Sequence, residues 1–269
     1  IKAHTVSDVG YAVQLSGGVD SSYITTILSQ TDSNIDTYSI ALPGITEDEA
    51  PYQQQVATHC GTKHHSHACS AEDFTALLPT ITRTLDAPLV HGGTAFLYVL
   101  CQHIAETHKV VLSGEGADEL FLGYDRHIIP ATHKIAHALK KTGLNPDFLP
   151  NMPKVRGLKS LMSKDIGMYA GSFTSDISED ILTVRNNAPY RQSVIKDYKT
   201  LLGQTIASDQ TSYLCSLFER QDRLSMAHGL EVRVPFCTPK LFDKLNQIRH
   251  SDKTTPVPKA LLKSLLTKH

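Results

Sequence analysis

Two kinds of hydrophobic pattern alternate along the first half of the chain. Short apolar runs rich in β-branched residues lie at 11–15 (YAVQL), 35–42 (IDTYSIAL) and 109–114 (KVVLSG), and such runs are typical of buried strands. Between them, apolar residues recur at the spacing of amphipathic helices. The expected helices are 21–30, 47–60, 71–86 and 94–108. Strands that alternate with helices predict an α/β fold, a parallel sheet flanked by helices.

The second half of the chain has a different pattern. In the first half a further short strand is expected at 62–70 (TKHHSHACS), between the second and third helices, whereas strand signals fade from about residue 125 onward. Helices are expected there at 133–141, within a segment near 156–206, at 212–229 and at 239–248. We therefore expect an α/β core over 1–125 and a mostly helical part of the same domain over 126–269. The segment 140–157, with three prolines and two glycines, is the best candidate for a mobile loop or a boundary.

Composition narrows the class of partner. Lys and Arg number 26 against 27 Asp and Glu, a formal net charge of -1, so no overall field would attract nucleic acid or an anionic membrane. Small molecules are the expected partners. The five widely spaced cysteines are typical of reduced thiols in a cytoplasmic protein. No apolar run approaches the ~20 residues of a membrane span, and the start at Ile1 favours a piece of a longer gene product.

The stretch 14–22 (QLSGGVDSS) connects the first expected strand to a helix. Ligands of open parallel sheets bind beyond the carboxyl ends of strands, where Gly17 and Gly18 would let backbone N–H groups turn towards a phosphate. Neighbouring hydroxyl groups come from Ser16, Ser21 and Ser22. Asp20 would repel phosphate unless a divalent cation lay between them, so it is a candidate Mg²⁺ ligand. An ordinary glycine-rich turn, with Asp20 capping the helix, is the alternative.

A second acidic stretch, 113–124 (SGEGADELFLGY), follows the strand at 109–114. Three carboxylates within five residues, Glu115, Asp118 and Glu119, repel one another unless a cation or donor neutralises them. Asp118 is therefore a second candidate Mg²⁺ ligand, and Glu115 is a candidate general base or lysine partner. The alternative is a helix start with acidic residues in its first turn.

Two further stretches hold charged residues among apolar ones. In 220–236 (RQDRLSMAHGLEVRVPF), Arg223, Glu231 and Arg233 indicate a half-buried ion network with an architectural role; a charged helix followed by a turn is the alternative. In 256–266 (PVPKALLKSLL), Lys259 is a candidate functional lysine, although most single lysines are surface residues.

Together these motifs resemble a known enzyme family. SGGVDSS resembles the pyrophosphate loop of the N-type ATP pyrophosphatases, in the PP-loop superfamily, and SGEGADELFLGY resembles the second ATP motif of glutamine-dependent asparagine synthetase. The stretches 220–236 and 256–266 resemble two later segments of the same family. The resemblance runs from about residue 6 to 266 and implies the adenine nucleotide alpha hydrolase-like fold with a C-terminal helical subdomain.

The resemblance also implies roles for individual residues. ATP and its pyrophosphate would be bound by Leu15, Ser16, Gly17, Gly18, Asp20, Ser21, Ser22, Ile40, Ser113 and Gly114. Asp20 and Asp118 would hold Mg²⁺. Glu115 would be the catalytic glutamate, and Lys259 would neutralise charge that develops on the transferring phosphate.

The implied reaction is the formation of an amide at the expense of ATP. A carboxylate, with aspartate as the first choice, is adenylated with release of pyrophosphate, and ammonia then gives asparagine and AMP. In the family the ammonia comes from glutamine through a glutaminase domain or subunit, and these residues contain no counterpart of the amino-terminal glutaminase. The sequence does not determine the oligomeric state, and a homodimer is compatible with it.

One departure from the family pattern keeps the acceptor open. Cys237 and Thr238 stand where family members continue with Leu-Asp. The same chemistry on another acceptor, as in β-lactam synthetases, lasso-peptide cyclases or sugar amidotransferases of polysaccharide biosynthesis, is therefore an alternative. A non-catalytic nucleotide-binding relic is a further alternative, which the intact Asp20, Glu115, Asp118 and Lys259 disfavour.

Two histidine-bearing stretches remain. HCGTKHHSHAC at 59–69 lacks the ligand spacing of a zinc site, and a helix, a turn at Gly61 and a strand explain it. APLVHGG at 87–93 is equally compatible with an acceptor pocket and with a helix-entry turn.

Overall fold

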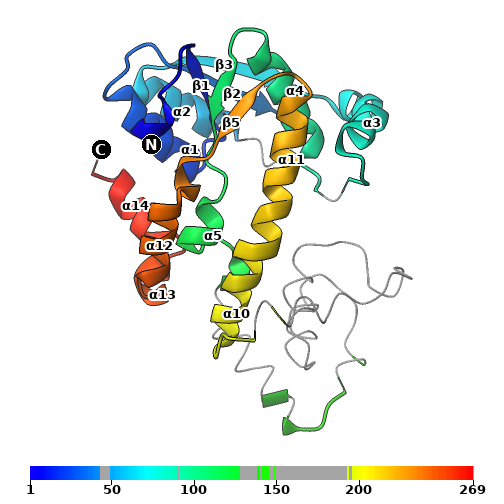
Figure 1. Cartoon of the computed structure of the whole chain (residues 1–269), viewed down its shortest axis with the longest axis vertical. Coiled ribbons are helices and arrows are strands. Elements are labelled where there is room, and N and C mark those ends of the chain that lie inside the picture. The colour runs from blue at the N-terminus through cyan, green and yellow to red at the C-terminus, as the bar shows by residue number, and fades with distance from the viewer. Residues whose placement is uncertain are drawn as a thin grey trace. The chain divides into compact units, whose positions relative to one another are not determined.

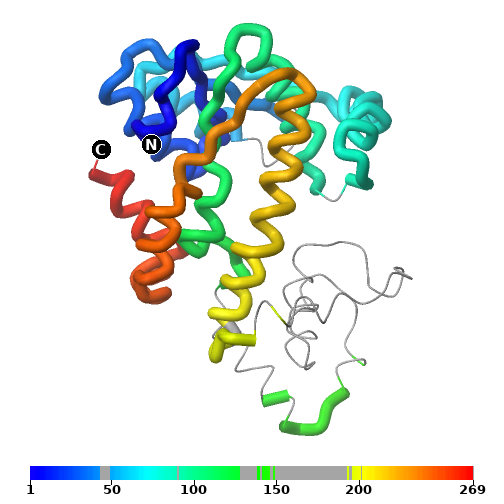
Figure 2. The backbone as a smooth tube through the Cα atoms, in the orientation of Figure 1, coloured from blue at the N-terminus to red at the C-terminus, as the bar shows by residue number. Residues whose placement is uncertain are grey.

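The computed structural model describes residues 1–42, 49–89, 91–127, 138–139, 141–145, 148, 193 and 196–268 (Figure 1). The chain forms two compact units. One consists of Ile1–Phe121 and Leu217–His269, and the other of Leu122–Ser216. Figure 2 shows the course of the backbone. The first unit contains the sheet and every site residue that the sequence predicts.

The sheet of the first unit has five parallel strands among the described residues. They are β1 (Tyr11–Gln14), β2 (Asp36–Ala41), β3 (Lys63–Ala68), β4 (Val110–Leu112) and β5 (Glu231–Arg233), in the order β3-β2-β1-β4-β5. In the sheet, β2 and then β3 lie on one side of β1, and β4 lies on its other side. The order therefore reverses between β1 and β4, and ligands of open α/β sheets bind at such a switch point. The predicted α/β class is confirmed.

Helices lie before, between and after these strands along the chain. Those of the first half are η1 (Lys2–His4), α1 (Val19–Ser29), α2 (Ala50–Cys60), α3 (Ala71–Leu85), α4 (Thr94–Ala105) and α5 (Ala117–Phe121). Those of the second half are η2 (Asp125–His127), α10 (Leu201–Ser208), the π-helix η4 (Asp209–Tyr213), α11 (Leu214–Met226), η5 (Pro235–Cys237), α12 (Pro239–Gln247), α13 (His250–Thr254) and α14 (Ala260–Leu266). None of the described helices is long and apolar enough to cross a membrane.

The predicted helices of the first half agree with α1 to α4 where the residues are described. Local signals set their ends: Ser70 and Asp73 form a reciprocal capping box at the start of α3, and Gly61 ends α2 in the left-handed conformation, with φ 65°. Only glycine adopts that conformation without a steric cost. The predictions at 133–141 and 140–157, and that near 156–206 up to residue 192, fall mostly outside the described residues.

Successive residues of the central strands pack against opposite faces of the sheet. Val13 and Leu112 belong to a core with α1, α5, α12 and α14, whereas Ala12 and Val111 belong to a core with α4. This follows from the alternation of side chains along a strand. Both faces of β1 and β4 are thus buried, which explains their nearly continuous apolar sequence.

The expectation that strands end near residue 125 is wrong at β5. This strand pairs with β4 in parallel register, with Val110 opposite Glu231 and Leu112 opposite Arg233. Its sequence is EVR, three residues of which two are charged, so neither length nor alternation marks it as a strand. The pairing with a buried strand, a tertiary effect, determines its conformation.

The second unit contains a buried ion cluster. Arg126 of η2 donates from Nε to both carboxylate oxygens of Asp209, at 3.0 and 2.9 Å, and His127 Nε2 lies 2.8 Å from Asp209 Oδ2. The guanidinium lies over the rings of Tyr124 and Tyr213, 3.8 and 4.9 Å from their centroids. A buried charge needs such partners. The cluster joins the segment after α5 to the π-helix η4.

Burial of Lys253 in α13 generates a prediction about stability. The side chain is 1% exposed, and burial lowers the pKa of Lys253 to about 8. Between that value and the ordinary lysine pKa the unfolded chain binds more protons, so stability rises as pH increases through this range. We expect Lys253→Met to raise the free energy of unfolding at pH 7 by roughly 1–3 kcal/mol.

Urea unfolding at pH 7 and pH 10 measures this difference. Most of the advantage of Lys253→Met should be lost at pH 10, where the native lysine is largely neutral. Lys244→Met removes an exposed lysine of α12 and serves as the control, with little change at either pH. An advantage of Lys253→Met that is equal at both pH values would contradict the assignment.

Candidate functional site

The loop between β1 and α1 crosses the carboxyl end of the sheet. Gly18 is the N-cap of α1, and Gly17 has φ 83°. A Cβ on Gly17 would lie 2.9 Å from the backbone nitrogen of Gln53, so both the dihedral angle and the space require glycine. The start of α2 therefore packs directly on this loop.

Serine hydroxyl groups hold the shape of the same loop. Ser16 donates its backbone N–H to Ser21 Oγ at 3.1 Å, and the two hydroxyl oxygens lie 3.0 Å apart. Ser22 donates from Oγ to the carbonyl oxygen of Gly18 at 2.7 Å. The predicted phosphate-binding serines are thus brought together around the first turn of α1, whose N–H groups are polarised to attract anions.

Three distant segments meet at one ion cluster, which we call the lysine clasp: Asp20, Asp118 and Lys259. Lys259 Nζ lies 2.5 Å from Asp20 Oδ2 and 2.7 Å from Asp118 Oδ1. Exposed fractions of the side chains are 11% for Lys259, 19% for Asp20 and 32% for Asp118. Gly114 permits the approach, because a Cβ there would lie 3.0 Å from Asp20 Cβ.

Burial and charge act in opposite directions on the lysine clasp. Burial raises the pKa of Asp20 above its ordinary value, against the attraction of Lys259. For Lys259, burial alone would lower the pKa, but attraction by Asp20 and Asp118 outweighs it and the pKa is raised. The lysine is therefore an ammonium ion at neutral pH.

The donors of the clasp are suited to a cation. Asp20 Oδ1 is buried and has no hydrogen-bond partner among the residues described, while Oδ2 already faces a positive charge. The structure brings together no group of three or more His, Cys, Asp or Glu side chains suited to a metal within its described part. A site with two carboxylates fits Mg²⁺, which binds one or two protein carboxylates and takes its other ligands from phosphates and water.

Glu115 has a different partner from the one the sequence suggested. Arg220 of α11 donates from Nη2 to Glu115 Oε1 at 2.9 Å, and both side chains are mostly buried. Burial raises the pKa of Glu115, and the guanidinium of Arg220 opposes this rise. Within the described part of the chain Glu115 therefore pairs with an arginine, and Lys259 bonds to the two aspartates instead.

Sequence reasoning missed Arg220. It lies three residues before Arg223 in the same stretch, so the two occupy neighbouring positions on α11, and periodicity alone does not distinguish them. In the structure Arg223 donates to the carbonyl oxygen of Leu85 at 2.8 Å and pairs with Glu219 at 2.9 Å. Arg220 instead faces the site.

The predicted network of Arg223, Glu231 and Arg233 is divided into two groups. Arg233 pairs with Glu231 at 2.8 Å and donates from Nη1 to the carbonyl oxygens of His4 and Val6, each at 2.8 Å. Arg223 bonds to other partners, as described above. The Glu231–Arg233 pair attaches the N-terminal segment to β5, which is an architectural role.

The predicted adenine-binding positions lie on adjacent strand ends. Leu15 donates its N–H to the carbonyl oxygen of Tyr38 at 2.8 Å, and the carbonyl oxygen of Ile40 accepts from Gln53 Nε2 at 3.2 Å. Ser113 donates its N–H to the carbonyl oxygen of Arg233 at 2.9 Å. Because β2, β1 and β4 are neighbours, the three residues lie next to one another at the carboxyl ends of these strands.

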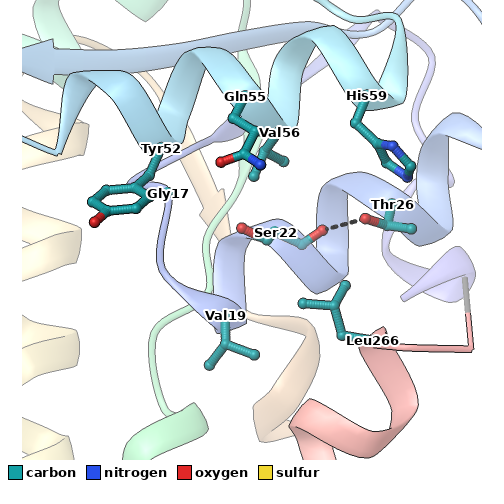
Figure 3. Close-up of a pocket in the computed structure, with 9 residues that line it drawn as sticks. All are labelled: Gly17, Val19, Ser22, Thr26, Tyr52, Gln55, Val56, His59 and Leu266. Atoms are coloured by element: carbon teal, nitrogen blue, oxygen red, sulfur yellow. Dashed lines mark hydrogen bonds between the residues drawn. The ribbon is translucent and has the colours of Figure 1, made fainter.

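A pocket of about 420 Å³ lies beside the loop, between α1, α2 and α14 (Figure 3). Its lining residues are Gly17, Val19, Ser22, Thr26, Tyr52, Gln55, Val56, His59 and Leu266. Gly17 and Ser22 are predicted pyrophosphate ligands, but the described lining includes neither the clasp nor Glu115. The pocket therefore runs along the flank of α1 from its first turn, beside the clasp and not around it.

Comparison with known proteins gives a family match over the whole chain. The family model described as asparagine synthase matches residues 1–269. Asparagine synthetase [glutamine-hydrolyzing] 1 of Bacillus subtilis is 29% identical to this chain. The matched region covers 94% of this chain and 43% of the relative's own length. Asparagine synthetase B [glutamine-hydrolyzing] of Escherichia coli is 35% identical over 46% of this chain and 25% of its own length. The chain thus spans less than half of these curated relatives.

The Glu115–Arg220 pair generates a prediction about titration. Arg220→Met removes the charge that opposes the effect of burial, so the pKa of Glu115 should rise further. Carboxyl resonances of a protein labelled with ¹³C-glutamate would report it as a titration displaced to higher pH.

Arg223→Met is the matched control. It removes an arginine of the same helix that bonds to Glu219 and Leu85, and it should leave the titration of Glu115 in place. Equal displacement in both variants would indicate a general effect of charge and not the contact with Arg220.

Proposed function

Since the chain belongs to the asparagine synthase family, we propose that it is the synthetase part of an ATP-dependent amide-forming ligase. The supporting observation is the convergence of Asp20, Glu115, Asp118 and Lys259 at the switch point between β1 and β4. The names of the relatives agree with this class. Substrates and partners of the whole protein belong to the same proposal, because the chain covers only part of those relatives.

ATP would bind along the carboxyl edge of the sheet. Leu15 and Ile40 present backbone groups to the adenine, Ser113 and Gly114 contact the nucleotide, and the loop 16–22 holds the pyrophosphate through backbone N–H and hydroxyl groups. Asp20 and Asp118 would hold Mg²⁺, which neutralises phosphate charge and favours departure of pyrophosphate.

The reaction proceeds in two steps. An oxygen of the substrate carboxylate attacks the α-phosphorus of ATP, and the bond from this phosphorus to the bridging oxygen breaks to release pyrophosphate. Ammonia then attacks the carbonyl carbon of the acyl-adenylate, loses a proton and displaces AMP. Lys259 stabilises negative charge on the transferring phosphate, and the carboxylate form of Glu115 accepts the proton of the attacking amine.

Aspartate is the proposed acceptor, with asparagine as the product. Cys237 supports keeping other carboxylates as a second candidate class, because its Sγ lies 3.9 Å from the carbonyl oxygen of Glu115. The residue that departs from the family pattern is thus in contact with the proposed catalytic segment. A different side chain at this position changes the wall behind Glu115.

Ammonia would come from glutamine through a glutaminase domain or subunit, as the names of the relatives suggest for those proteins. A cytoplasmic location and a homodimer stay predictions from the sequence.

Pyrophosphate release from Mg-ATP tests the proposal. With ammonium chloride as the nitrogen source, we expect release that depends on aspartate, together with asparagine detected by mass spectrometry. Asp20→Asn should lower the rate by about 100-fold or more, because it removes one charge from the proposed cation site. Asp243→Asn, at an exposed carboxylate of α12, should retain the rate.

Other outcomes separate the alternatives. Release that depends on a different carboxylate would keep the chemistry and exclude aspartate. Binding of ATP without turnover on any carboxylate, equal in the parent chain and Asp20→Asn, would favour the non-catalytic relic.

A further inference from the structure

The ammonium group of Lys259 occupies the position expected for the proposed Mg²⁺ ion. This single group bonds to one oxygen from each of the two carboxylates proposed to hold Mg²⁺, at 2.5 and 2.7 Å. Those oxygens belong to the first turns of α1 and α5, the helices that follow β1 and β4, and they are close enough for one small cation to contact both. Ammonium and Mg²⁺ therefore require the same oxygen atoms.

We propose that Lys259 and Mg²⁺ compete for Asp20 and Asp118, so that binding of the metal displaces the ammonium group towards the substrate phosphates. This inference rests on the proposed function, because it takes the two aspartates as the metal site. It adds an exchange between two cations, in which the free enzyme keeps its lysine on the metal ligands until the metal arrives.

The charge balance of the site supports exchange over simultaneous binding. Two carboxylates and one ammonium leave a net negative charge, and Lys263 is a further lysine whose charge acts on Asp20. One divalent cation balances the two carboxylates alone. With the metal and the ammonium both present, the site carries excess positive charge in a mostly buried environment, which is costly. Phosphate groups of ATP supply the negative charge that accommodates both cations.

The backbone around Lys259 permits such a movement. Lys259 is the N-cap of α14 and precedes its first helical residue, and Leu262 anchors the helix because its side chain is fully buried. Lys259 itself has φ 56°, a conformation that is uncommon for residues other than glycine. The fixed backbone keeps Lys259 close to the loop between β1 and α1, while rotation within its long side chain moves the ammonium group.

Binding of metal alone tests the competition. Electron paramagnetic resonance with Mn²⁺, displaced by Mg²⁺, gives the affinity in the absence of ATP, carboxylate and ammonia. Removal of the competing ammonium in Lys259→Met should tighten metal binding by about tenfold or more. A lysine that acts only on phosphate would leave the affinity unchanged, so an unchanged or weaker affinity overturns the proposal.

Lys263→Met is the matched control. It removes an exposed lysine one turn further along α14 and should change metal affinity by no more than about twofold, since its charge acts on Asp20 through the general field alone. Equal tightening in both variants would overturn the inference of direct competition.

A second measurement uses the unaltered chain and does not depend on how the variants fold. Mild acetylation followed by mass spectrometry reports the reactivity of Lys259 relative to Lys263. Mg²⁺ should raise this ratio, because displacement of the amino group from its two carboxylate partners leaves it more accessible to the reagent. No change or protection of Lys259 would overturn the proposal. Neither measurement involves an acceptor, so the competition can hold where the assignment of aspartate fails.

Discussion

The parallel pairing of β1 with β4 is the constraint on which the site depends. The register sets Ala12 opposite Val111 and Val13 opposite Leu112. The carboxyl ends of the two strands therefore lie side by side in the sheet. The loops that leave them then have to share the same space. Close approach of Gly114 to Asp20 follows from this pairing, and so does the crowding of two carboxylates. Repulsion between them is offset only by a cation, which Lys259 supplies.

The same acidic stretch contains two carboxylates with different environments. Glu115 is mostly buried and bonds to Arg220, whereas Asp118, three residues later, is partly exposed and bonds to Lys259. Glu115 precedes α5 and Asp118 lies in its first turn, and the two side chains reach different partners although the sequence places them together. One carboxylate is thereby suited to proton transfer and the other to holding a cation, as is typical where neighbouring acids have separate roles.

Much of this architecture follows from local sequence. The apolar runs of β1, β2 and β4 mark the central strands, and glycines and serines at their ends mark the loops, since each signal depends on a few neighbouring residues. What could not be predicted depends on tertiary pairing. The strand β5 exists because Arg233 and its neighbours complete the edge of β4. Arg220, the partner of Glu115, lies 105 residues away in the chain, and Asp20 lies 239 residues from Lys259. No local pattern distinguishes Arg220 from Arg223.

The contact between Cys237 and Glu115 connects the departure from the family pattern to the proposed catalytic segment. Phe236 is buried in the core beside α5 and α12, so the backbone that carries Cys237 is fixed. Cys237 Sγ approaches the backbone carbonyl of Glu115 and not its carboxylate, and burial raises the pKa of this thiol to about 12. The thiol is therefore neutral and acts as a small packing group. A change at this position alters the volume behind the glutamate, while the Arg220 pair and the lysine clasp, which belong to other segments, keep their geometry.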